Sequence, residues 1–159
     1  MKTSYLLPHK YKIVGWILFI LGLVTGSIIV FGGYELDVLK VNVISIYDEG
    51  GFLGLEGEEG FFNIIENSIL DELAALSTII GGLLVGFTKE KVEDEFIYKL
   101  RNDSLVWAII FNYMILVFTI LFVYEFTFFH VLVFNMFTPL MFFVIRFNFL
   151  RLKSTRYEE

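Results

Sequence analysis

Long runs of apolar residues, separated by short polar stretches, recur four times along the chain. They lie at about 13–33, 69–87, 105–124 and 130–150, and the only charges inside them are two acids at the start of the second run and Arg146 near the end of the fourth. A helix needs about 20 apolar residues to cross a hydrocarbon core of about 30 Å. The pattern therefore predicts an all-α membrane protein with four transmembrane helices.

Two other interpretations of these runs fit less well. A buried helical core would not need several uncharged runs near the length of a membrane span. A cleaved signal peptide is also disfavoured, because the first run exceeds the usual apolar length of about 7–15 residues and no A-x-A-like cleavage site follows it.

Lys and Arg are distributed unevenly between the segments that flank the runs. They gather before the first run, between the second and third, and after the fourth, whereas the segment 34–68 holds Lys40 alone against eight acids. Cytoplasmic loops carry the excess of Lys and Arg. We therefore expect a multi-pass protein of the cytoplasmic (inner) membrane with both termini and the segment 88–104 in the cytoplasm.

The segment 34–68 is then an acidic outer loop. Residues 38–47 are rich in β-branched side chains and DEGG at 48–51 has the composition of a turn, which together predict a short β-hairpin. FFNII at 61–65 is amphipathic and is expected on the membrane surface. A calcium site at Glu56, Glu58 and Glu59 would use suitable oxygen ligands, but a loop motif of fixed spacing is missing and an acidic outer loop is the simpler interpretation.

Small residues recur at helical spacing in the first two runs. Such ridges let helix backbones approach closely in lipid, so they predict either packing of the first helix on the second or a seam between copies of the chain. The residues are Gly22, Gly26, Ala74, Thr78, Gly82 and Gly86.

The last two runs contain many Phe residues and no Gly, which favours bulky packing and lipid contact over a flavin or quinone pocket. Pro139 lacks the N–H that would bond the carbonyl of Asn135, so a kink is expected there. Polar residues at membrane depth often mark transport pathways, and Asn112, Tyr113, Asn135 and Pro139 are the candidates. The two Asn side chains are expected to form hydrogen bonds across helices.

The segment 88–104, TKEKVEDEFIYKLRNDS, is dense in alternating charges. Val92, Phe96 and Leu100 recur every fourth residue, which predicts a cytoplasmic amphipathic loop helix with one apolar stripe. This stripe, with Lys99 and Arg101 beside it, is a candidate surface for a protein partner. A solvated connector is the other interpretation.

Composition excludes several kinds of chemistry. The 159 residues include no Cys and two His, so disulfides, thiol nucleophiles and Cys-based metal sites are excluded. The acids at 93–95 have no nucleophile or His nearby in the sequence, and no H-E-x-x-H or other catalytic motif is present. We expect no enzyme activity, no cofactor and no direct binding of nucleic acid.

LLPHKYKIVGW at 6–16 and FTKEKVEDEFIYKLRNDSLVWA at 87–108 together resemble a group of small bacterial integral membrane proteins with four predicted spans, often encoded beside a small helix-turn-helix regulator. The charged core D-E-x-x-x-K-x-R is Asp94, Glu95, Lys99 and Arg101. The resemblance implies a regulatory module whose cytosolic surface meets a soluble partner.

Two functions are compatible with these features. The first is a non-enzymatic membrane component that acts by interaction or regulation through its cytosolic surface. The alternative is a channel or transporter subunit built by homo-oligomerisation on the small-residue seams. In both cases the bilayer is a partner, and the first adds a cytosolic protein.

Overall fold

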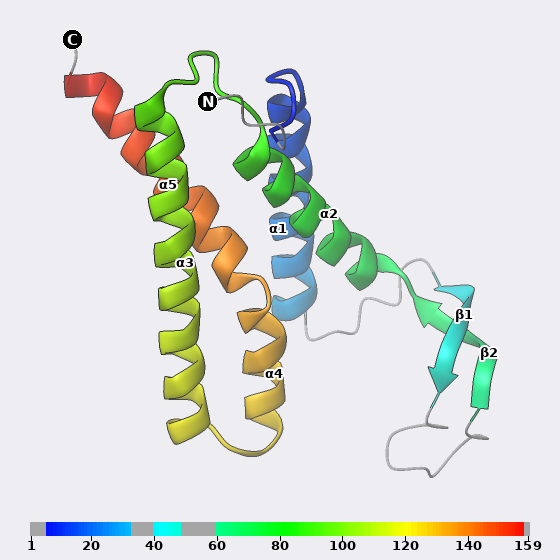
Figure 1. The fold of residues 1–159 in the computed structure, drawn as a ribbon. Helices are drawn as coiled ribbons and strands as arrows, with labels where there is room; N and C mark the ends of the chain where they lie inside the picture. Colours follow the sequence, from blue (N-terminus) through cyan, green and yellow to red (C-terminus); the bar gives the residue numbers. More distant parts are fainter. Residues whose placement is uncertain (1–5, 33–39, 49–59, 158–159) are drawn as a thin grey trace. The chain divides into compact units, whose positions relative to one another are not determined.

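A computed structural model of the chain describes residues 6–32, 40–48 and 60–157 (Figure 1). Its elements follow the order of the predicted ones, with a small antiparallel sheet between the first two helices. They are α1 (Tyr11–Phe31), β1 (Lys40–Asp48), β2 (Gly60–Ser68), α2 (Leu70–Phe87), α3 (Glu95–Phe122), α4 (Glu125–Asn135) and α5 (Thr138–Tyr157). The predicted fold class, helical spans with a short hairpin between the first two, is therefore confirmed.

Three of these helices, α1, α2 and α3, are each long and apolar enough to cross a membrane. The fourth predicted span is a bent pair, in which α4 and α5 meet at an angle of 43° across a short break. The pair begins at Glu125 rather than at 130. Pro139 is the second residue of α5, where its missing N–H costs least because that group has no partner within the helix. The expected kink is present, but it separates two helices instead of bending one.

The bent pair runs from one end of α3 back to the other. Arg151, near the end of α5, forms an ion pair with Glu90, which precedes α3 by a few residues. A re-entrant loop would bring α5 back to the end of α3 where α4 starts. The contact at Glu90 therefore identifies α4 and α5 as one broken span.

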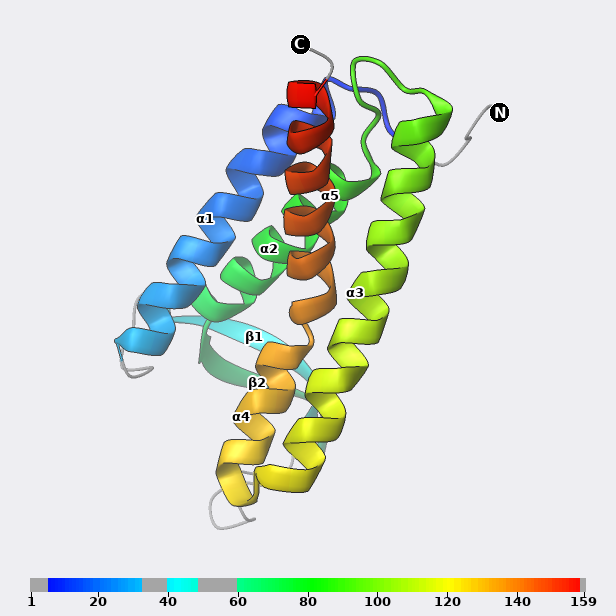
Figure 2. The same cartoon turned by 90° about the vertical axis from the view of Figure 1, so that its left-hand side faces the viewer.

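The chain divides into two compact units. One holds Met1–Leu23 and Leu76–Glu159, and the other holds Val24–Ala75. In the first unit, α3 and α5 lie side by side (Figure 2). Its core draws on α1, α2, α3 and α5 and is formed by Phe19, Val85, Ala108, Phe143, Val144 and Phe147.

Glycines set the distance between α1 and α2 in the first unit. A Cβ atom on Gly81 would lie 2.7 Å from the backbone Cα of Phe19, and one on Gly15 would lie 2.7 Å from Cβ of Leu84. Any larger residue would overlap the facing helix. The two helices therefore cross at Gly15 and Gly81, neither of which belongs to the predicted ridge.

The predicted ridge on α2 packs against α5 as well. A Cβ on Gly82 would lie 2.6 Å from a methyl carbon of Leu140, and one on Gly86 would overlap the ring of Phe143. Gly26 on α1 instead faces open space. The other ridge residues are buried: Gly22, Ala74 and Thr78.

The second unit contains the hairpin. β1 and β2 pair antiparallel from Lys40 opposite Ser68 to Asp48 opposite Gly60. FFNII at 61–65 is thus part of β2. Asp48 of the predicted DEGG turn ends β1, whereas residues 49–51 and the three acids at 56–59 lie outside the described residues.

The predicted loop helix over 88–104 is wrong in its first half. Residues 88–94 are irregular, and the helix begins at Glu95 and continues without a break into the third span. Asp94 explains this start, because its side chain accepts a hydrogen bond of 2.8 Å from the backbone N–H of Ile97. Such an N-cap satisfies one of the free N–H groups at a helix start.

Candidate functional site

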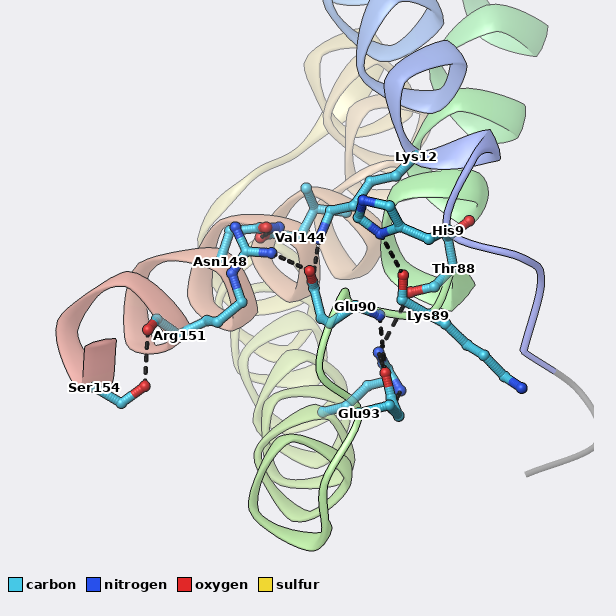
Figure 3. A network of polar contacts seen from close by, with 11 residues as sticks. His9, Lys12, Thr88, Lys89, Glu90, Glu93, Val144, Asn148, Arg151 and Ser154 are labelled. Atoms are coloured by element: carbon cyan, nitrogen blue, oxygen red, sulfur yellow. Dashed lines mark hydrogen bonds and ion pairs between the residues drawn. The ribbon is translucent and has the colours of Figure 1, made fainter. Parts of the chain in front are cut away.

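Charged side chains from four segments meet at the end of the first unit where α1 begins (Figure 3). We call this group, Lys12, Glu90, Glu93, Arg101 and Arg151, the ion cluster. At its centre the two carboxylate oxygens of Glu90 pair separately with the Lys12 ammonium and the Arg151 guanidinium. The Glu90 and Lys12 side chains are each 8% exposed, and that of Arg151 is 25% exposed. One acid thus ties α1 and α5 to the loop between α2 and α3.

The backbone joins the N-terminal segment to the same loop. The N–H of Leu7 donates to the carbonyl of Phe87 at 3.0 Å, and the N–H of Lys89 donates to the carbonyl of Leu7 at 2.9 Å. Nδ1 of His9 lies 2.9 Å from the carbonyl oxygen of Lys89. Because a carbonyl only accepts, this nitrogen carries the proton. The residues before α1 are therefore held along the end of α2.

A second acid of the cluster folds residues 88–94 around Arg101. Oε1 and Oε2 of Glu93 lie 2.5 and 3.2 Å from the two terminal nitrogens of the Arg101 guanidinium. Oε2 also accepts a 2.9 Å bond from the backbone N–H of Glu90. The guanidinium carbon lies 5.0 Å from the ring centre of Phe147, within cation–π range. Arg101 thus connects the loop to the apolar core.

The burial of Arg101 corrects its expected position on a partner surface. The residue is 2% exposed, so its guanidinium is not available to a partner. Its pair with Glu93 joins the loop to α3 and does not run along one helix. Leu100 is also turned inward and packs against the core.

The rest of the predicted stripe is at the surface. Val92 is 74% exposed and Phe96 is 53% exposed, and Lys99 is exposed beside them. The three consecutive acids have separate roles: Glu93 pairs with Arg101, Asp94 caps α3, and Glu95 is exposed. They do not form one acidic site.

A further cation joins α3 to α5 outside the ion cluster. Nη1 of Arg146 lies 3.0 Å from a carboxylate oxygen of Asp103 and 3.2 Å from the hydroxyl of Ser104. The guanidinium also lies 5.6 Å from the ring centre of Trp107. Arg146 therefore holds the two helices together.

The candidate pathway residues do not form a visible polar route. The side-chain oxygens of Asn112 and Asn135 are buried and accept no hydrogen bond, so the expected cross-helix bond is not made by these atoms. Tyr113 is 61% exposed on α3, and Pro139 is the second residue of α5.

Within the described part of the chain, no group of three or more His, Asp or Glu side chains is placed to hold a metal ion. Nδ1 of His130 lies 2.9 Å from the carbonyl of Phe126, one turn earlier on the same helix. The ion cluster pairs each of its acids with a Lys or Arg side chain. Its chemistry is that of a clamp between chain segments.

Sequence reasoning missed the clamp formed by Glu90. Its partners are 78 and 61 residues away in the sequence, so no local spacing reveals them. A usable signal did exist: Glu90 is an acid three residues after an apolar span, and it lies between two lysines.

No protein-family model, curated protein or solved structure matches the chain. The class is defined by the described helices: three apolar spans and a fourth broken one make this a multi-pass membrane protein. The resemblance to small four-span bacterial proteins stays a prediction.

Proposed function

We propose that this protein is a non-enzymatic component of the membrane that binds a soluble protein partner at its cytosolic end and acts there as an interaction or regulatory module. The observation that carries the proposal is the buried carboxylate of Glu90 between Lys12 and Arg151. A buried charge is tolerated only with its partners in place. The N-terminal segment, the loop 88–94 and the end of α5 therefore form one rigid platform.

The sidedness of this platform is supported by the distribution of cations. Lys and Arg cluster in the same three segments that the ion cluster and the backbone bonds join. The positive-inside rule assigns each of the three segments to the cytosolic side separately. The three assignments agree with one another, because the segments meet at one end of the unit. A cytosolic platform is the arrangement that satisfies all of them.

The platform surface offers apolar contact among charges of both signs, because Asp94 and Glu95 are exposed there as well as the lysines. Val92 and Phe96 are exposed, and Lys91 and Lys99 are exposed near them in the sequence. Interfaces bury aromatic and aliphatic anchors at the centre and keep charge at the rim. The fitting partner is a protein with an apolar groove edged by charged side chains of both signs.

The test compares Val92→Ser combined with Phe96→Ser against the control Asn102→Ser, which changes an exposed polar residue of the same region. Each tagged variant is purified in mild detergent, and the protein that co-purifies with the unchanged chain is quantified. We expect the double variant to lose that protein while membrane insertion and the elution volume of the chain stay the same. Leu100 is left unchanged because it packs in the core.

Retention of the partner by the double variant would overturn the proposal. The same holds if the unchanged chain brings down no protein in stoichiometric amount, because the cations would then serve only anionic lipid headgroups.

A homo-oligomeric channel or transporter subunit is the second candidate. It is favoured by Gly26, which faces open space on α1 and so leaves room for a helix of another copy. Solute flux into liposomes that contain the purified protein tests this function. Flux lost in Gly26→Leu would support it, and a monomer that passes no solute would exclude it.

A further inference from the structure

The hairpin of the second unit has one face of large apolar side chains that the described structure leaves uncovered. Ile44 and Ile64 are directly opposite each other across the two strands. Ile46 lies two residues further along β1 and shares this face, because side chains two apart in a strand lie on the same side. Phe62 lies two residues along β2 from Ile64, where a backbone φ of 62° departs from a regular strand. The three isoleucines, which are 71 or 72% exposed, therefore define the face. We call Ile44, Ile46 and Ile64 the hairpin face.

The hairpin face has a polar boundary on the side toward α2. Asn42 and Glu66 are paired across the strands, lie two residues from the isoleucine pair, and are exposed. The face is therefore amphipathic along its length, with a compact apolar patch bordered by an amide and a carboxylate. Monomeric soluble proteins rarely leave such contiguous patches open unless a partner or a membrane covers them.

A two-stranded hairpin is marginally stable by itself in water. In this chain one end of the hairpin is fixed. The side-chain nitrogen of Asn67 donates a 2.6 Å hydrogen bond to the carboxylate of Glu72 in the first turn of α2. The antiparallel pairing with β2 then holds β1 in register. The remaining stabilisation must come from whatever covers the hairpin face.

Chain connectivity places the end of the hairpin that joins α2 beside the bilayer. β2 ends at Ser68 and α2, a candidate membrane span, begins at Leu70. One residue separates the strand from this span, so the end of β2 lies at the membrane surface. α1 ends at Phe31, which is 90% exposed and belongs to the same unit. Aromatic residues at the ends of spans are typical of the interface between membrane and water.

We propose that the hairpin lies on the membrane and buries Ile44, Ile46 and Ile64 at the boundary between lipid headgroups and acyl chains. A second copy of the chain is a poorer occupant, because the segment 34–68 carries eight acids against one Lys and like charges oppose pairing. For the same reason the fitting lipid is zwitterionic. This inference is independent of the proposed cytosolic function.

The absence of Cys from the chain makes single-cysteine labelling specific. The probe is a nitrobenzoxadiazole fluorophore on Ile64→Cys in the full-length protein, reconstituted into phosphatidylcholine vesicles. The matched control is Ser45→Cys, which neighbours Ile44 in the strand and lies on the opposite face. A second test variant, Ile44→Cys, is measured in its place if Ile64→Cys does not fold.

We expect blue-shifted emission for Ile64→Cys and quenching by nitroxide lipids that is at least about twofold stronger than for Ser45→Cys, as an interfacial apolar face requires. Emission typical of water with no lipid quenching would overturn the proposal. A third result would overturn the proposal in favour of a second copy of the chain. In that case the emission is blue-shifted, lipid nitroxides do not quench it, and the blue shift disappears when the protein is diluted in lipid.

Discussion

Glu90 is the residue whose change tests the clamp most sharply. Glu90→Gln removes one negative charge and keeps nearly the same shape. In the unchanged protein this carboxylate pairs with Lys12 and Arg151. In the variant, Lys12 and Arg151 both lose their acid. Lys12 is also buried, so water cannot solvate its charge as it solvates that of a surface lysine.

The size of the effect follows from the exposure of each partner. Lys12 is as buried as Glu90, at 8% side-chain exposure, and breaking a buried pair from one side costs about 3–5 kcal/mol. Arg151 is 25% exposed, so its loss adds about 0–1 kcal/mol, as for a surface pair. We expect Glu90→Gln to lower the free energy of unfolding by about 3–5 kcal/mol, most of it from Lys12.

The assay is reversible unfolding of the purified protein from mixed micelles by sodium dodecyl sulfate, followed through the fluorescence of Trp16 and Trp107. Glu95→Gln is the control, because it removes an exposed acid near the same loop. Lys12→Met combined with Glu90→Gln should be more stable than Glu90→Gln alone, since the buried cation is gone. A Glu90→Gln variant as stable as the Glu95→Gln control would refute the clamp.

Three further predictions use the same unfolding assay. Gly81→Ala should lower the free energy of unfolding by about 1–3 kcal/mol, because the added methyl group overpacks the crossing of α1 and α2. Gly26→Ala has open space around it and should be neutral or stabilising by up to about 1 kcal/mol. Equal effects at the two positions would contradict the crossing. Asp94→Ala should cost about 0.5–2 kcal/mol through loss of the cap on α3, and an unchanged midpoint would show that the cap is dispensable. Arg101→Lys should cost about 1–3 kcal/mol, because an ammonium cannot replace the two-pronged contact with Glu93; full stability of this variant would mean that only the charge matters.

The spans could be predicted from the sequence because membrane insertion depends on the apolarity of one continuous segment. The first strand of the hairpin could be predicted for a similar reason, since its β-branched residues are a local signal. FFNII at 61–65 is predicted on the membrane surface and is instead part of the second strand. The break before Pro139 was foreseen from the missing N–H, which is also a local property. These features need no knowledge of which segments meet.

The contacts between helices could not be predicted in the same way. Gly15 and Gly81 are single glycines on different helices, and only the tertiary fold shows that they face each other. The helical spacing of Val92, Phe96 and Leu100 was misleading because Asp94 starts the helix after Val92, so the three residues do not share one helical face. Arg101 is predicted on the surface, since nothing nearby in the sequence reveals that the ring of Phe147 lies against its guanidinium.

The central claim is that the N-terminal segment, the loop 88–94 and the end of α5 form one platform on the cytosolic side. Labelling of single cysteines with a membrane-impermeant maleimide, in sealed vesicles of known orientation, tests it directly. We predict that Lys10→Cys, Lys91→Cys and Lys153→Cys are labelled only from the cytosolic side, and that Ser45→Cys is labelled only from the opposite side. Labelling of any one of the first three from the outer side would contradict the account.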